Sequence, residues 1–450
     1  MGKDAIDLGK TNVYKLFGQY FFPTLLGMLS VSAVTTIDGI FIGHGVGSEG
    51  IAAVNICVPI FMFYTGLGLM VGAGCSVVSS IHLSQGKAKA ARINVTQAML
   101  FATIATVASS LLMFVFPDAT SRLLGASPEL LPQVKEYLVW FVLSMVFGVW
   151  ESIGLFVVRL DGSPRYAMWC SLIAAIANTI LDWLFIFPLG WGLMGAAFAS
   201  SLSVVIGGLM VLIYLMFFAK ELRFIRIKAN RKSFHYTLRN LRYQCTIGSS
   251  AFIGECTMAV LAFVGNHVFL KHLGNDGVGA FGIACYYTPF IFMVGNAIAQ
   301  SAQPIISYNF GLGQHRRVSQ TFHVALLTAI TCGGIVTAIF CLFPHQLVAL
   351  FLSPSCPTAH IAIEGFPYFS AGFVCFIVNL TCVGYFQSVE KAKRAAFYSL
   401  LRGCFFLIPS FFIVPSVIKG DSGIWISLSV SEALTTLAII ASHRLSFLSR

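Results

Sequence analysis

Long apolar segments follow one another along the whole chain, and they constrain the fold more than any other feature. Each has about twenty or more residues with almost no charge, the length that an α-helix needs to cross a bilayer. Backbone groups inside a bilayer must be paired within the protein, which leaves helices for segments of this length. Twelve such segments lie at residues 13–42, 51–80, 93–116, 134–158, 166–187, 192–218, 245–270, 278–307, 321–343, 361–387, 397–418 and 423–443. The sequence predicts an all-α integral membrane protein with twelve transmembrane helices.

The basic residues follow the predicted topology. Net charge is +11, and with the N-terminus inside, 23 of the 28 Lys and Arg residues lie on the inner side and four on the outer side. This asymmetry places both termini in the cytoplasm, and it explains the positive charge without nucleic-acid binding. The twelve cysteines show no CxxC or CxxH spacing, and no hydrolytic, redox or phosphate-binding motif such as GxxxxGK[ST] occurs. We therefore expect neither an enzyme nor a bound cofactor.

The chain repeats itself. The run Gly47–Ala53 matches the run Gly274–Ala280 at a fixed offset in numbering (274 − 47 = 227), and further matches continue at 227 or 228. The first six segments therefore resemble the last six in the same orientation. We predict an amino-terminal six-helix lobe at 1–219, a basic cytoplasmic linker at 220–242 and a carboxy-terminal six-helix lobe at 243–450. Transporters with such 6+6 repeats hold their substrate in a central cavity between the halves.

Two acids and an amide lie within apolar segments of the first half. Asn178 and Asp182 are four residues apart, so on a helix they share one face. Asp38 lies at a matching depth in the first segment, about five residues from the outer end. A carboxylate at membrane depth costs ~2.5–3.5 kcal/mol even on the lenient insertion scale. Ser200, in the sixth segment, adds a hydroxyl that is a further oxygen ligand or bonds to its own helix backbone.

The repeat relation makes this polar set specific to one half. The position that corresponds to Asp38 is Gly265, and the one that corresponds to Asp182 is Ser410. An architectural polar cluster would more plausibly be duplicated with the repeat. Oxygen ligands suit a hard cation, and two close carboxylates also suit a proton. The sequence predicts a site for Na+ or H+ and does not choose between them.

Other polar residues in the apolar segments have weaker support. Glu255 lies mid-segment in the second half and is an additional candidate, whereas Glu151, Glu432 and Arg402 are interpreted as interhelical partners or as snorkelling side chains. Pro23 lies fifteen residues before Asp38 and is expected to kink the first helix, because proline removes a backbone hydrogen bond.

Several motifs in order resemble the multidrug and toxic compound extrusion (MATE) family. They are Pro23, the run Asp38–Gly43, Gly162-Ser163-Pro164, Asn178 with Asp182, and the run Gln303–Gly311. The resemblance covers essentially the whole chain and is greatest to bacterial members whose acids lie in the amino-terminal half.

The resemblance implies an antiporter that exports small organic, commonly cationic compounds in exchange for Na+ or H+. It further implies that Asp38, Asn178, Asp182 and Ser200 form the ion site, that Pro23 is the family's kink in the first helix, and that Glu255 matches an acid that some relatives use. A monomer in the bacterial inner membrane, in contact with lipids and without nucleic-acid partners, is expected. The chain departs from the family at Glu390, where relatives often have glycine.

Two other functions fit a twelve-helix membrane protein. A flippase for lipid-linked precursors or polysaccharides belongs to related superfamilies with repeated bundles, but the chain has no wide belt of basic residues within its apolar segments. A non-transporting sensor or scaffold would tolerate changes at both aspartates.

Overall fold

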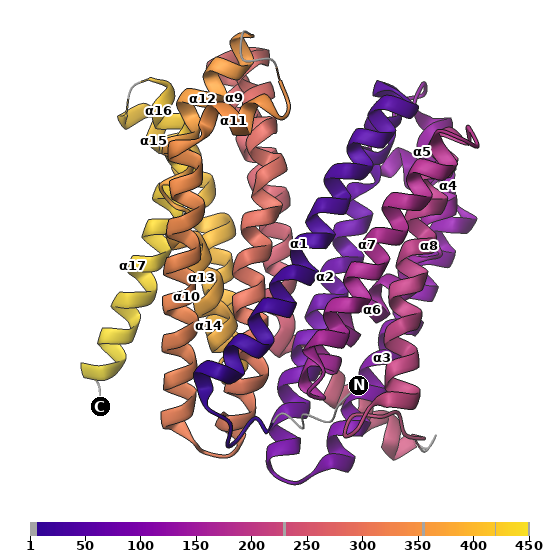
Figure 1. Cartoon of the computed structure of the whole chain (residues 1–450), viewed down its shortest axis with the longest axis vertical. Helices are drawn as coiled ribbons and strands as arrows, with labels where there is room; N and C mark the ends of the chain where they lie inside the picture. Colours follow the sequence, from indigo (N-terminus) through magenta and orange to yellow (C-terminus); the bar gives the residue numbers. More distant parts are fainter. Residues whose placement is uncertain (1–6, 228–230, 353–355, 419, 449–450) are drawn as a thin grey trace. The chain divides into compact units, whose positions relative to one another are not determined.

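The computed structural model describes residues 7–227, 231–352, 356–418 and 420–448, and every regular element within these ranges is helical (Figure 1). The first half comprises α1 Val13–Gly45, α2 Ser48–Ser84, α3 Ala88–Val115, α4 Pro117–Leu123, α5 Leu131–Val142, α6 Met145–Leu160, α7 Pro164–Ile186, α8 Gly192–Ile213 and the π-helical turn η1 Tyr214–Phe218. The chain thus forms the all-α fold that the apolar segments predict.

The second half repeats this order. It comprises α9 Arg231–Gly311, α10 His315–Leu342, α11 Pro344–Ala349, α12 Pro357–Ser370, α13 Phe373–Ser388, α14 Ala392–Leu400, the π-helical turn η2 Leu401–Phe405, α15 Leu407–Val417, α16 Asp421–Trp425 and α17 Ser427–Leu448. Element α9 contains two helices joined at Gly274, whose backbone is not helical. Eight elements are long and apolar enough to span a membrane, and two bent helix pairs raise this to ten among the described residues. With α9 counted as two helices and the shorter apolar helix of α17 included, the twelve predicted segments are accounted for.

The bends and the glycine turns of the first half recur in the second half at the repeat offset of 227 or 228 residues. Helices α5 and α6 meet at a bend of 50°, and α12 and α13 at one of 48°. The first helix of each pair ends at Val142 and Ser370, which differ in number by 370 − 142 = 228. Gly47 and Gly274, related by the offset of 227, both have positive φ, at 98° and 64°. The repeat therefore extends to the bends and turns as well as to the helices.

One turn breaks this agreement. Gly162 has a φ of 86°, and its counterpart in the second half (390 − 162 = 228) is Glu390, with a φ of 58°. Glu390 is the one non-glycine residue with positive φ in the described part of the chain. A left-handed backbone costs a residue with a side chain roughly 1–2 kcal/mol. The departure from the family pattern at Glu390 therefore carries local strain.

Replacement of Glu390 by glycine is expected to stabilise the protein. Relief of the strained backbone outweighs the greater freedom of glycine in the unfolded chain, and we expect a gain of about 0.5–1 kcal/mol in the free energy of unfolding. Thermal unfolding of detergent-solubilised protein measures the change. Gly162→Ala is the matched control and is expected to lower the melting temperature, because it places a side chain in the same turn of the other half. A lower melting temperature for Glu390→Gly would contradict the assignment of strain.

The outer surface of the helices suits a lipid environment. On α3, the side chains of Leu100, Ile104, Leu111 and Leu112 are 49–63% exposed, and on α10 the exposed residues include Leu327 and Ile335. Apolar faces of this size are costly in water and match the hydrocarbon of a bilayer. The chain is a multi-pass membrane protein.

The helices pack into two compact units that do not follow the predicted lobe boundaries. Unit 1 contains Met1–Phe252 and Pro304–Val318, and unit 2 contains Ile253–Gln303 and Ser319–Arg450. Residues 243–252, expected in the carboxy-terminal lobe, pack with unit 1 because small residues let α9 approach α2 closely. A side chain on Gly74 would overlap the backbone of Gln244, and one on Gly248 would overlap the backbone of Met70. Gln244 also donates a hydrogen bond to Asn94 of α3 (3.1 Å).

The segment Pro304–Val318 joins unit 1 through polar contacts with the start of the chain. Arg317 donates hydrogen bonds to the backbone carbonyls of Leu8 (3.1 Å) and Thr11 (2.7 Å). The side chain of Asn309 donates to Leu8 as well (3.0 Å). These contacts join residues far apart in the chain, so they could not be inferred from the boundaries of the apolar segments.

The predicted linker begins at a fixed point of unit 1. The Asp161 carboxylate accepts hydrogen bonds from the backbone N–H groups of Lys220, Glu221 and Leu222 (2.8–2.9 Å) and from the Tyr214 hydroxyl (2.8 Å). Four donors on one carboxylate satisfy it fully and hold the chain where it leaves η1. Residues 228–230 of the predicted linker lie outside the described residues.

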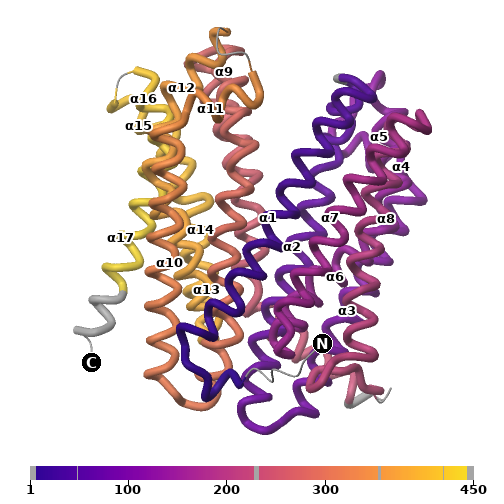
Figure 2. The backbone as a smooth tube through the Cα atoms, in the orientation of Figure 1, coloured from indigo at the N-terminus to yellow at the C-terminus, as the bar shows by residue number. Residues whose placement is uncertain are grey.

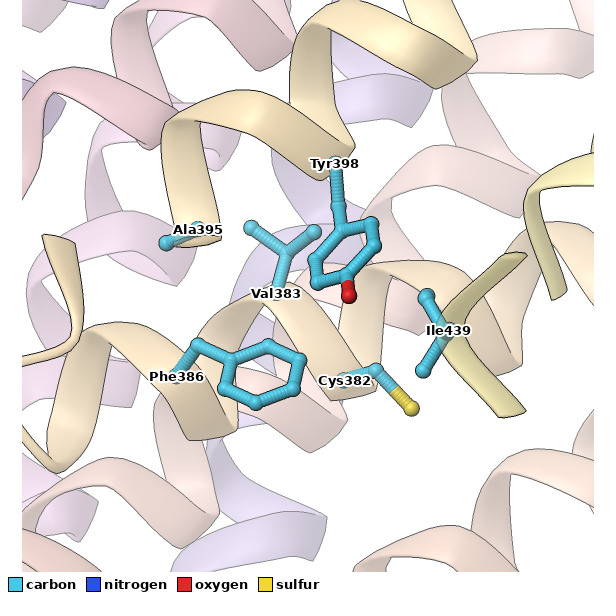
Figure 3. Close-up of a cluster of buried hydrophobic side chains, with 6 residues drawn as sticks. All are labelled: Cys382, Val383, Phe386, Ala395, Tyr398 and Ile439. Atoms are coloured by element: carbon cyan, nitrogen blue, oxygen red, sulfur yellow. The ribbon is translucent and has the colours of Figure 1, made fainter. Parts of the chain in front are cut away.

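An apolar cluster joins three helices of unit 2 (Figure 3). Cys382, Val383 and Phe386 of α13 meet Ala395 and Tyr398 of α14, and Ile439 of α17 completes the group. The Phe386 and Tyr398 rings stack with centroids 5.4 Å apart.

Candidate ion-coupling site

The candidate site lies where α1, α7 and α8 of unit 1 meet. Helices α1 and α7 lie side by side along the bundle (Figures 1 and 2), and Gly27 permits this, because its Cα faces the backbone of Met168. The buried face of α7 has residues at spacings of three and four, which end in Asn178, Asp182 and Phe185. The apolar periodicity of α7 therefore turns its amide and its acid toward the interior of the unit.

The structure brings together the four residues that the sequence predicts. Asn178 and Asp182 are 2% and 1% exposed, and Asp38 on α1 is partly buried. The Asp38 and Asp182 carboxyl groups are in contact with each other. The Asn178 amide nitrogen lies 3.5 Å from the Ser200 hydroxyl.

Four carboxyl and amide oxygens of this group lack hydrogen-bond donors among the described residues. Within the described residues, Asp38 Oδ1, Asn178 Oδ1 and both carboxylate oxygens of Asp182 are buried and find no protein hydrogen-bond partner. Buried polar atoms are normally paired, and two facing carboxylates repel each other unless something positive lies between them. A shared proton or a hard monovalent cation would satisfy these oxygens, and all of the available ligands are oxygen atoms.

Sequence reasoning missed a fifth residue. Tyr137 on α5 is 7% exposed, its hydroxyl is within hydrogen-bonding reach of Ser200, and it lies within electrostatic range of both Asp38 and Asp182. A phenol can either donate a hydrogen bond to a carboxylate or offer a lone pair to a cation. Tyr137 belongs to no repeated sequence pattern. The only signal that could have identified it as a site residue was its hydroxyl group within an apolar segment.

Two predicted residues lie elsewhere. Pro23 lies inside α1, about four turns before Asp38, and its role as a kink or hinge stays a prediction. Glu255 belongs to unit 2, is 8% exposed, and has one oxygen without a hydrogen-bond partner among the described residues. Its participation in ion coupling stays a prediction.

Arg402 and Glu432 form an ion pair, as their interpretation as interhelical partners predicts. Arg402 Nε lies 2.7 Å from Glu432 Oε1, and their side chains are 2% and 1% exposed. Asn379 donates to the other carboxylate oxygen (2.8 Å), and the guanidinium lies 4.0 Å from the centre of the Phe376 ring. Because Glu432 is paired in this way, we assign it to the architecture of unit 2.

A multi-pass helical chain with two matching halves, in which several acids have buried oxygens without a hydrogen-bond partner among the described residues, has the features of a membrane transporter. The MatE family model matches residues 23–184 and again residues 250–412. The starts of the two matches differ by 250 − 23 = 227 and their ends by 412 − 184 = 228, so the repeat predicted from the sequence is confirmed. The chain belongs to the MatE family, that of the MATE transporters.

Relatives of known name align with nearly the whole chain. The "Multidrug export protein MepA" of Staphylococcus saprophyticus is 25% identical over 436 residues, which cover 95% of this chain and 93% of the relative. The "FAD transporter" of Shewanella oneidensis is 24% identical over 449 residues, which cover 97% and 95%. Among solved structures, the "Outward-facing conformation of a multidrug resistance MATE family transporter of the MOP superfamily" superposes with a TM-score of 0.90 at 20% identity and covers 100% of this chain and 99% of that one. The fold is therefore that of MATE transporters.

Proposed function

We propose that the chain is a secondary antiporter that exports small organic compounds, commonly cations, in exchange for Na+ or H+. The observation that carries the proposal is the contact between the Asp38 and Asp182 carboxyl groups, beside an Asn178 oxygen that also has no donor among the described residues. Buried acids in this arrangement are stabilised when a cation or a proton is bound and destabilised when it leaves. Occupancy of the site is thus able to bias a conformational equilibrium.

The names of the relatives support transport of organic compounds. Several are multidrug export proteins, and one is a transporter of FAD, a large anionic molecule. The excess of Lys and Arg on one side supports a chain with both termini in the cytoplasm, in the inner membrane of a bacterium. We propose a monomer that needs no bound cofactor other than its coupling ion.

In the proposed cycle, the outward-facing protein binds Na+ or H+ at Asp38 and Asp182. Neutralisation of the two carboxylates changes the packing of α1 on α7, with Pro23 as the point at which α1 bends. This change weakens binding of the organic compound, which leaves to the outside. The loaded protein then turns inward, releases its ion to the cytoplasm and accepts a new substrate.

Efflux from proteoliposomes tests the proposal. The purified chain is reconstituted, a fluorescent organic cation is loaded, and a Na+ gradient or a pH gradient is imposed separately. We expect efflux with one of the two gradients, and that gradient identifies the coupling ion. Absence of efflux under both gradients would contradict export of organic cations, and a lipid-headgroup translocation assay on the same liposomes would then identify a flippase.

A further inference from the structure

Glu151 on α6 is an acid of unit 1 that the candidate site does not use. Its carboxylate lies against the backbone of Gly207 on α8, so that a Cβ at position 207 would lie only 2.6 Å from the carboxylate carbon. On the side of α7, it lies within electrostatic range of Cys170. Glu151 therefore points into the junction of α6, α7 and α8 instead of snorkelling to a membrane surface.

The contact with Gly207 fits the packing of two parallel helices. Gly148 of α6 lies against Val204 of α8, and Gly154 lies against Val211. Glu151 and Gly207 stand midway between these two contacts, at the same three- to four-residue spacing. The register of α6 on α8 thus places the backbone of Glu151 opposite Gly207.

No positive charge or hydrogen-bond donor of the described residues contacts the Glu151 carboxylate. The groups that face it are weakly polar or apolar, namely Cys170 on α7 and the backbone of Gly207 on α8. Cys170 is the one titratable group that faces it among the described residues. Glu151 is partly buried, and a carboxylate without a counter-charge inside a membrane-spanning bundle is stabilised by a proton or a bound cation.

The antiparallel register of α7 and α8 places Glu151 relative to the candidate site. Asn178 meets Ser200 near one end of this helix pair, and the Tyr166 hydroxyl donates to the Met210 carbonyl near the other (3.0 Å). Cys170 lies between the two, eight residues or ~12 Å along the helix from Asn178. Measured along the axis of α7, Glu151 therefore lies about two helical turns from Asn178, on the side of Asp161.

We propose that Glu151 is a second cation-binding carboxylate of unit 1, which takes H+ or Na+ between the Asp38–Asp182 site and the cytoplasmic end of α7. The ion that leaves Asp182 is held at Glu151 before it reaches the cytoplasm. This inference rests on the proposed antiport for the direction of ion movement, whereas binding at Glu151 is testable without transport.

Infrared difference spectroscopy of the purified full-length protein tests binding directly. A pH step or addition of Na+, without an organic substrate or a gradient, changes the carboxyl stretching bands of each acid that takes up the ion. We expect Glu151→Gln to lose one band and Asp182→Asn to lose a different one. Glu49→Gln, which alters an exposed acid of α2, is the matched control and is expected to leave both bands unchanged.

Efflux from proteoliposomes then tests the path. Glu151→Gln is expected to slow gradient-driven efflux about tenfold and to leave the infrared band of Asp182 in place. Glu151→Asp retains the acid and is expected to shift its band and restore part of the rate, which keeps the test valid if the Gln variant fails to fold. A Glu151→Gln spectrum identical to that of the wild type would overturn the proposal, and a lost band with unchanged efflux would remove Glu151 from the path. Failure of the wild type to transport would instead count against antiport and leave the spectroscopic result standing.

Discussion

Asp182→Asn is expected to lower gradient-driven efflux roughly 100-fold, near the upper end of ordinary coupling free energies. Asparagine has the shape of aspartate but carries no charge, and its amide can donate a hydrogen bond to the Asp38 carboxylate with which Asp182 is in contact. The variant thus imitates the ion-loaded site permanently. It removes the alternation between loaded and empty states on which the proposed coupling depends, while the protein remains folded in the membrane.

The initial rate of efflux from proteoliposomes measures this loss, together with the melting temperature of each variant. The repeat offers a matched control, because Ser410 stands in unit 2 where Asp182 stands in unit 1 and is likewise buried. Ser410→Ala is expected to retain most of the efflux. Efflux at the wild-type rate in Asp182→Asn, with the gradient still required, would remove Asp182 from the coupling site.

The sequence predicted the residues of this site because they follow simple rules. Asn178 and Asp182 are one turn apart in an apolar helix, and Asp38 has the same depth in another. Polar and charged side chains are energetically costly at membrane depth, and this cost identifies the three residues as candidates. Tyr137 could not be found in this way, because a tyrosine is common in apolar segments and its nearness to Ser200 depends on how α5 packs on α8.

The fold could also be predicted from simple sequence patterns, except where it depends on how distant parts of the chain pack together. Apolar length identified the twelve segments, and repeated glycine turns identified the two halves. The boundaries of the compact units depend on the contacts of Gly74, Gly248 and Arg317, which join residues far apart in the chain. The bends after Val142 and Ser370 also escaped prediction, since α5 has proline only in its first turn and α12 continues past Pro367 to Ser370. Their recurrence at the repeat offset shows that the two halves share bends as well as sequence motifs.

Arg402→Met is expected to lower the free energy of unfolding by about 3–5 kcal/mol, the usual cost of leaving one member of a buried ion pair alone. Glu432 would retain the hydrogen bond from Asn379 (2.8 Å) but lose its only described counter-charge, which now lies 2.7 Å away. Glu432→Leu is expected to cost a similar amount, because it leaves the guanidinium buried over the Phe376 ring. Thermal unfolding in detergent measures both losses.

The double variant Arg402→Met with Glu432→Leu separates charge from packing. Apolar side chains of similar volume can replace a buried ion pair at little or no cost, so we expect most of the stability to return. Lys135 and Asp118 form the matched exposed pair, 3.1 Å apart with side chains 43% and 59% exposed, and Lys135→Met is expected to change stability by less than about 1 kcal/mol. If the double variant lost as much as the two single variants together, packing of the long side chains would be the source of stability. Recovery would show that Glu432 needs Arg402 because both are buried. Asp182 is buried and Asp38 partly buried without such a partner among the described residues, so both remain available to an ion.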